Sequence, residues 1–109
     1  NICISNVDDH LRNHGFLRAG DGWRLSPAFD VNPNPDKDHH VLAIDDRDAT
    51  PDSSLLLATT TYYRIPGKAL TTVVEQVRNA VRTWEQRARA LGAPPSEIAL
   101  MHAVIDPDR

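Results

Sequence analysis

Apolar residues recur with a helical period through the last part of the chain. Residues 67–92 read GKALTTVVEQVRNAVRTWEQRARALG, with apolar side chains at three- and four-residue steps from Leu70 to Leu91. This spacing predicts one long amphipathic helix that ends at Gly92. The following PPSEIALMHAVI predicts a short last helix with four inward-facing residues, Ile98, Met101, Val104 and Ile105.

Shorter elements are predicted in the first half. ICISNV is expected to be the end of a buried helix or a strand, and HGFLRAGDGWRLSPAFD predicts a β-hairpin, because AGDG supplies the positive-φ positions of a tight turn. Residues 32–40 predict an exposed loop, and VLAI at 41–44 a short strand. In TPDSSLLLATTTYY a helix is expected with Thr50 as N-cap, Pro51 at its first position and Asp52 in its first turn.

Composition narrows the class of protein. The 109 residues carry a net charge of -3, with 40% hydrophobic and 25% charged residues, which is typical of a globular domain. The acidic balance argues against a dedicated nucleic-acid-binding surface, and no apolar run reaches the roughly 18 residues of a membrane span. The single cysteine, Cys3, fits a reducing cytoplasm. Because the chain opens on Asn1 and runs directly into ICIS, we expect it to be a fragment of a larger protein.

The polar stretch NVDDHLRNHGF, residues 6–16, holds the densest group of chemically versatile side chains. Asp8 and Asn13 are spaced as in protein-kinase-type phosphotransferases, where the aspartate accepts the substrate hydroxyl proton and the asparagine holds magnesium. A second oxygen ligand is expected after the hairpin, where Asp30 is the carboxylate of LSPAFDV. These three residues form a candidate base and metal-ligand set in the expected chain order.

The two motifs NVDDHLRNHGFL and GWRLSPAFDVNP together resemble the catalytic core of the HipA-like serine/threonine kinases, the toxins of type II toxin–antitoxin pairs. That family carries an Asp-x-His-x-x-Asn loop, a short hairpin and a Leu-Ser/Thr-Pro-x-Tyr/Phe-Asp segment. The resemblance assigns the catalytic aspartate to Asp8, the loop histidine to His10, and the ATP-phosphate and magnesium ligands to Asn13 and Asp30. We expect the His10 ring to bond a backbone carbonyl and fix the loop, with direct proton transfer as its alternative role.

The resemblance covers essentially all of 1–109 and implies an α+β, mostly helical fold, the C-lobe portion of a protein-kinase-like fold with a short β-hairpin near the N-terminus. Residues 1–31 would hold the catalytic loop, hairpin and metal-binding segment, 32–49 a loop with a short strand, and 50–109 a helical subdomain. A glycine-rich phosphate loop and a nucleotide-anchoring lysine do not precede Asp8 in these residues. We therefore expect the fragment to be inactive alone.

The family also implies a reaction and partners. The full protein would transfer the γ-phosphoryl of ATP, with Mg²⁺, to a protein hydroxyl, and an aminoacyl-tRNA synthetase is a candidate substrate. A HipB-like DNA-binding antitoxin would hold it and provide its only link to DNA. A cytoplasmic location without membrane contact is expected, and the family also allows a homo-oligomer.

Other functions stay open on the residues alone. A C-lobe that has lost catalysis would be an interaction module. A small metal-dependent phosphoesterase or nuclease would use Asp8, Asp9, His10 and His14, and a zinc site would draw on His10, His14, His39 and His40. In the kinase interpretation Asp9 is a solvated neighbour, His39 and His40 lie in a solvated loop, and Trp23 belongs to the core.

Overall fold

The segment that leads into Asp8 lies at the centre of the fold. The structure is a computed structural model that describes residues 1–109, and its first element is the 3-10 helix η1 (Ile2–Ile4). The segment predicted as the end of a helix or a strand is thus a short helical turn, and four of its residues are buried: Cys3, Ser5, Asn6 and Val7.

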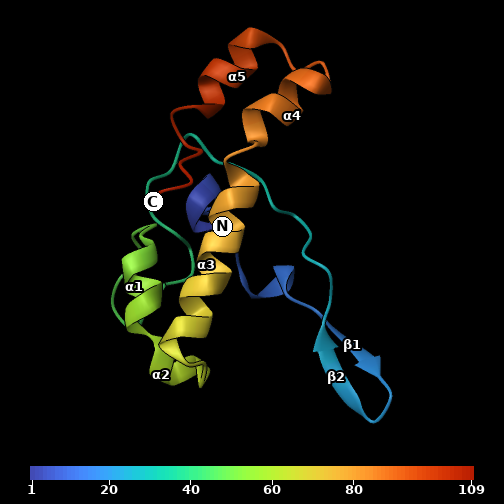
Figure 1. The fold of residues 1–109 in the computed structure, drawn as a ribbon, viewed down its shortest axis with the longest axis vertical. Coiled ribbons are helices and arrows are strands. Elements are labelled where there is room, and N and C mark those ends of the chain that lie inside the picture. The colour runs from blue at the N-terminus through green and yellow to red at the C-terminus, as the bar shows by residue number, and fades with distance from the viewer.

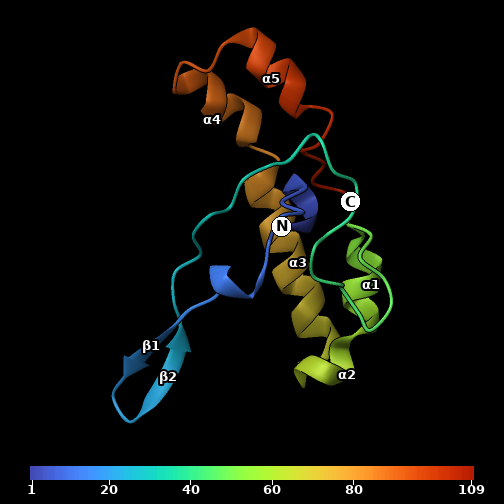
Figure 2. The same cartoon turned by 180° about the vertical axis from the view of Figure 1, so that it is seen from behind.

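Three remote segments hold this central segment. They donate backbone hydrogen bonds to it, from Asn34 to Ser5 (3.0 Å), from Val41 to Val7 (2.8 Å) and from Asp106 to Cys3 (2.8 Å). The N-terminal turn and the C-terminal segment therefore lie side by side in the views of Figure 1 and Figure 2. The position of Asp8 is set by contacts with much later parts of the chain.

The predicted hairpin is confirmed. Strands β1 (Phe16–Ala19) and β2 (Gly22–Leu25) pair antiparallel, with Phe16 opposite Leu25 and Ala19 opposite Gly22. Gly20 takes a φ of 59° in the turn, which glycine adopts without a Cβ clash. The hairpin projects from the body (Figure 1), and Trp23, expected in the core, is 70% exposed. That expectation is wrong because no other element covers the hairpin.

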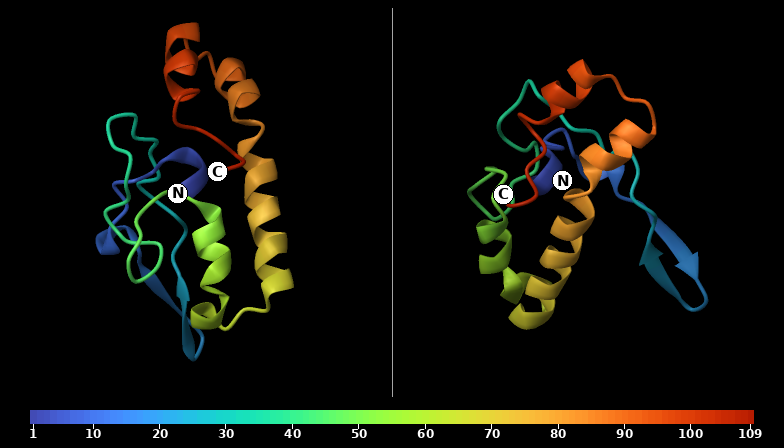
Figure 3. Two further views of the ribbon diagram at one scale, coloured as in Figure 1. Left: turned by 90° about the vertical axis from the view of Figure 1, so that its left-hand side faces the viewer. Right: turned by 45° about the horizontal axis from the view of Figure 1, so that its top comes forward.

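The second half is helical. Its five helices are α1 (Ser53–Ala58), α2 (Thr60–Tyr63), α3 (Gly67–Val81), α4 (Trp84–Ala90) and α5 (Pro95–Met101). With the hairpin they make a small α+β chain, as expected. Helix α1 lies beside α3 (Figure 3), and α4 and α5 form a pair beyond the end of α3. The buried apolar core is small and joins the N-terminal turn to the helices through Cys3, Val7, Leu70, Val74, Ile98 and Val104.

The long helix predicted over residues 67–92 is divided. The hydrogen bond from Arg82 N to Arg78 O closes α3, and Arg87 N to Thr83 O opens the next series. The apolar period continues across the break to Trp84, so periodicity alone could not reveal it. The predicted end is confirmed, since Gly92 has a φ of 85° directly after the last turn. In the last helix Ile98 is buried, as expected. The helix ends at Met101, so Val104 and Ile105, which were predicted to lie within it, follow its end.

Two local predictions are wrong. The N-cap of α1 is Asp52, whose carboxylate accepts a hydrogen bond from Ser54 N at 2.7 Å, and Thr50 lies outside the helix. Residues 41–44 form bends and no strand, because their backbone bonds run to separate partners such as Val7 and Asp48. None of the helices combines the length and apolar character that crossing a membrane requires.

Candidate functional site

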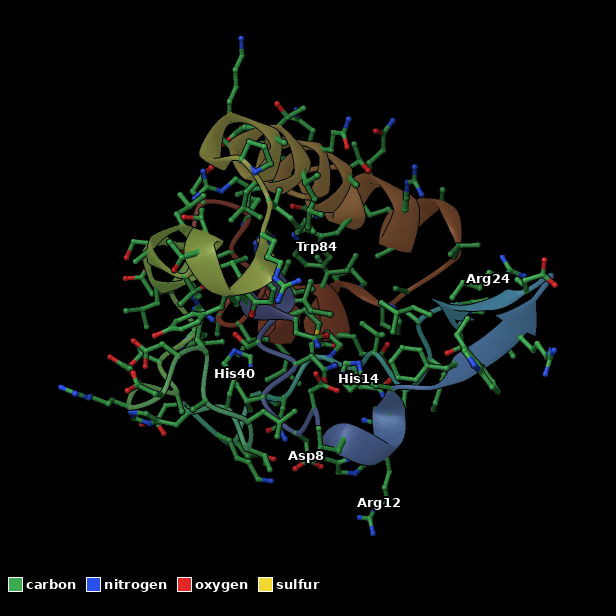
Figure 4. The ribbon with its side chains drawn as sticks, turned by 90° about the horizontal axis from the view of Figure 1, so that it is seen from below. Asp8, Arg12, His14, Arg24, His40 and Trp84 are labelled. Atoms are coloured by element: carbon green, nitrogen blue, oxygen red, sulfur yellow. The ribbon has the colours of Figure 1, made fainter.

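Residues 8–14 form an irregular loop, called loop 8–14 below. The chain leaves buried Val7, and the loop contains the single 3-10 turn η2 (Leu11–Asn13). Asn13 N donates to His10 O at 2.8 Å and His14 N to Leu11 O at 3.3 Å. Figure 4 shows Arg12 extending away from the molecule.

Asp8 is ion-paired with a lysine from the loop that follows the hairpin. Lys37 Nζ lies 2.6 Å from Asp8 Oδ1, and the Asp8 side chain is 60% exposed. This hydrogen bond and the lysine charge lower the pKa of Asp8 below its ordinary value. Asp8 is therefore ionised and accessible at neutral pH, as a proton acceptor must be.

Asp30 occupies a left-handed turn after β2. Its φ is 53°, which is uncommon for a residue other than glycine, and Asn32 Nδ2 donates to its Oδ1 at 2.9 Å. An aspartate tolerates this backbone better than a bulky or β-branched residue would. The turn places Asp30 on a different hollow from its neighbours Phe29 and Val31.

Asp8 and Asp30 border the same small hollow, called the Asp8 hollow below. Its volume is about 100 Å³. Five of its six lining residues are asparagines or aspartates, and the sixth is a proline: Asn6, Asp8, Asp30, Asn32, Asn34 and Pro33. Carboxylate and amide oxygens are the ligands that Mg²⁺ prefers, so this donor set fits a hard cation. The sequence did not single out the three asparagines, although Asn32 and Asn34 follow Asp30 by two and four residues.

Asn13 borders a neighbouring hollow, called the Asn13 hollow below. This hollow has a volume of about 160 Å³ and includes Leu25, Phe29 and Val31 from β2 and the segment after it. The structure thus brings two of the three expected residues, Asp8 and Asp30, to one hollow and leaves Asn13 at the next. The roles assigned to all three stay predictions.

His10 does not make the bond expected of it. Its Nδ1 is buried without a hydrogen-bond partner, and its ring bonds no backbone carbonyl. The 3-10 turn itself, through His10 O, gives the loop its local hydrogen bond. The catalytic assignment of His10 stays a prediction.

Asp9 is not the solvated neighbour that the sequence suggested. Its side chain is only 13% exposed, and its Oδ2 accepts hydrogen bonds from Asn1 Nδ2 at 2.7 Å and His14 Nε2 at 3.0 Å. A carboxylate withdrawn from water needs such donors. Asp8 and Asp9 therefore face different surroundings, as expected for adjacent residues of a loop.

The histidines are separated. His39 pairs with Asp38 at 2.8 Å and is exposed, as expected, whereas His40 is 8% exposed with its Nε2 unpartnered, so its placement in a solvated loop is wrong. Burial lowers the pKa of His40. No three His, Cys, Asp or Glu side chains come together as metal ligands, so the four-histidine zinc site does not form.

The largest hollow, about 400 Å³, lies between η1, α1 and α3. Eleven of its sixteen lining residues are hydrophobic, including Leu56, Leu70 and Val74. Asp9 and His14 border both this hollow and the Asn13 hollow. The pair therefore lies between the two hollows.

Comparison with known proteins assigns the chain to a family. No curated protein and no solved structure matches it significantly. The family model of the HipA-like C-terminal domain matches residues 1–99, which is most of the chain and contains loop 8–14, the hairpin and Asp30. The chain belongs to the HipA-like C-terminal domain family.

Proposed function

We propose that this chain carries the catalytic base and metal ligands of a HipA-like serine/threonine kinase that acts in a toxin–antitoxin pair. The observation that carries the proposal is the meeting of Asp8 and Asp30, from segments on either side of the hairpin, at one hollow lined by oxygen donors. The family match supports the toxin-related context. Phosphoryl transfer needs little covalent chemistry from the protein, and it does need this kind of positioned charge.

In this mechanism Asp8 accepts the proton of the substrate hydroxyl at its carboxylate. The hydrogen bond from Lys37 keeps Asp8 ionised, and the exposure of the side chain leaves it open to a protein substrate. Asp30 and Asn13 would hold Mg²⁺, which would offset the negative charge of the ATP phosphates. The amide of Asn32 holds Asp30 Oδ1 in place.

The partners follow from the family and are part of the proposal. The phosphorylated protein would be a translation factor such as an aminoacyl-tRNA synthetase, and a HipB-like antitoxin would bind the kinase and contact DNA. The setting would be the cytoplasm. No observation favours the phosphoesterase, since Asp9 and His14 pair with each other and border other hollows than Asp8 does.

The test is transfer of labelled γ-phosphoryl from ATP by the intact protein that contains these residues. Asp8→Asn and Asp30→Asn should each lower the transfer rate by about 10³-fold or more, while thermal unfolding stays close to that of the parent protein. Asp36→Asn is the matched control, because Asp36 lies in the next loop and borders neither hollow. Undiminished transfer in Asp8→Asn would refute the role of the base, and no transfer by the parent protein would favour an interaction module.

A further inference from the structure

The pair formed by Asp9 and His14 joins the two ends of loop 8–14. The ring of His14 donates to Asp9 at 3.0 Å, and the turn η2 with Asn13 lies between them in the chain. Only two local backbone bonds, to His10 O and Leu11 O, otherwise shape this turn. A single 3-10 turn of this length is weak alone, so the side-chain bond across its base contributes to its shape.

The pair is itself anchored to the buried centre of the fold. Asn1 Nδ2 donates to Asp9 at 2.7 Å, and Asn6 Nδ2 donates to Asn1 Oδ1 at 2.8 Å. Asn6 is 3% exposed and borders the Asp8 hollow, while His14 borders the Asn13 hollow. One line of hydrogen bonds therefore runs from Asn6, at the Asp8 hollow, to His14, at the Asn13 hollow.

We propose that Asp9 and His14 are positioning residues that fix the backbone at Asn13, the proposed magnesium ligand, at the end of the η2 turn. The proposal rests on the proposed function, because it takes Asn13 as a ligand. Asp9 fixes the His14 ring, and the backbone of His14 carries the position of Asn13. Second-sphere groups that orient a ligand typically contribute about 10–100-fold to metal affinity or activity.

The first measurement is the affinity for Mn²⁺, used as a spectroscopic substitute for Mg²⁺, in the intact protein with a non-hydrolysable ATP analogue, by electron paramagnetic resonance. We expect His14→Ala and Asp9→Ala each to weaken Mn²⁺ binding about tenfold. The double variant should be no weaker than Asp9→Ala alone, because Asp9→Ala already removes the bond to His14 together with the bond to Asn1. His14→Gln retains an N–H donor and should restore binding to within about threefold of the parent protein.

A second readout separates positioning from loss of fold. In steady-state assays the Mg²⁺ concentration for half-maximal rate should rise about tenfold in His14→Ala, while the rate at saturating Mg²⁺ falls less than about threefold. Asp9→Asn preserves the volume of the side chain and should show a smaller loss in the same direction. This variant keeps the test decisive if an alanine variant does not fold.

The matched control is His39→Ala, which breaks a His–Asp pair of similar length that borders none of the three hollows described above and should leave Mn²⁺ affinity unchanged. Asn13→Ala separates the two proposals. If Asn13→Ala weakens Mn²⁺ binding and His14→Ala and Asp9→Asn do not, the positioning role is overturned and the metal site stands. If Asn13→Ala leaves Mn²⁺ affinity unchanged, Asn13 is not a ligand, and the metal assignment of the proposed function fails independently of the positioning role. If the losses of Mn²⁺ affinity add in the double variant, Asp9 and His14 do not act through their shared bond and the positioning role is overturned.

Discussion

Lys37 and Asp8 form an ion pair of 2.6 Å between the loop after Asp30 and loop 8–14. The proposed base is thus held by a residue that no kinase motif in the sequence pointed to. Both side chains are at least half exposed, so a substrate hydroxyl can reach Asp8 beside the lysine. The pair lowers the pKa of Asp8, and in the proposed mechanism this pKa would set the lower pH limit of catalysis.

Removal of this lysine should shift the pH dependence of phosphoryl transfer. The pKa of Asp8 is lowered in the folded protein, so the carboxylate stays ionised as the pH falls below the ordinary aspartate value. In Lys37→Gln this pKa should rise toward that value, and the acid limb of kcat/KM should move to higher pH. Lys68→Gln, in α3, is the control and should leave the profile unchanged. An unshifted acid limb in Lys37→Gln would assign that limb to another group.

The neighbouring histidines His39 and His40 should affect stability in opposite directions with pH. Burial lowers the pKa of His40, so its neutral form favours folding and its contribution is lost as the pH falls below about 6.5. The bond to Asp38 raises the pKa of His39, so its contribution is present below about 6.5 and is lost as the pH rises through its folded pKa. Urea unfolding of the parent protein, His40→Gln and His39→Gln at pH 5 to 8 measures how the free energy of unfolding changes with pH in each. Equal slopes in the two variants would contradict the burial of His40.

The packing of α5 predicts that alanine substitution of two isomeric residues has very different effects on the free energy of unfolding. Ile98 is 3% exposed and Leu100 is 53% exposed on the same helix. Ile98→Ala should lower the free energy of unfolding by about 2–5 kcal/mol, because it leaves a cavity. Leu100→Ala should change it by no more than about 0.5 kcal/mol. Denaturant unfolding compares them directly, and similar losses would mean that α5 packs with another face.

The N-cap of α1 can be tested directly, because the sequence predicted Thr50 at this position and the structure has Asp52 there. Asp52→Ala should lower the unfolding midpoint, since it removes the acceptor for Ser54 N. The Ser54 bonds lower the pKa of Asp52, so this contribution is present above the ordinary aspartate pKa and disappears as the pH falls through the folded value. Asp46→Ala, an exposed carboxylate outside the helix, serves as control. A loss in Asp46→Ala as large as in Asp52→Ala would argue against the cap.

The 109 residues assayed alone should transfer no phosphoryl group. They contain the proposed oxygen ligands, but these residues include no glycine-rich loop or anchoring lysine ahead of Asp8, which kinases use to hold the nucleotide phosphates. Incubation with labelled ATP, Mg²⁺ and a generic protein substrate tests this against an Asp8→Asn control. Transfer above that control would show that these residues are sufficient for the reaction.

The same preparation should also self-associate. Phe16, Trp23 and Leu25 on the hairpin are more than half exposed, and such clusters of apolar side chains favour association. Sedimentation at increasing concentration measures it, and replacement of Phe16 and Trp23 by serine should reduce it. Leu91→Ser changes an exposed leucine elsewhere and is the control. Equal association of the hairpin variant would exclude the hairpin as the contact.

The sequence predicted the elements that depend on local signals. The turn at Gly20, the helix end at Gly92 and the buried side of α5 at Ile98 follow from glycine conformations and apolar spacing. The break after Val81 has no glycine or proline to mark it, and it lies where Arg82 pairs with Asp108, far along the chain.

The site was predictable only as a set of residue types. The spacing of Asp8, Asn13 and Asp30 identified candidates, but whether Asp9 is buried or Lys37 reaches Asp8 depends on the folded path of segments far apart in sequence. The burial of His40 has the same origin, since a stretch of polar residues and prolines predicts exposure. Local sequence could not distinguish these side chains from their solvated neighbours.

The hydrogen bonds that hold the segment before Asp8 also bear on the order of folding. Ser5 Oγ donates to Val104 O at 2.7 Å, and Asp106 N bonds Cys3 O. Contacts between residues so distant in sequence form late, because a long chain must first be brought together. During synthesis Val104 and Asp106 leave the ribosome long after loop 8–14 does, because most of these 109 residues lie between them. The entry to the proposed catalytic loop is therefore among the last parts of this chain to be fixed during synthesis, and until then the loop is open to proteases and chaperones.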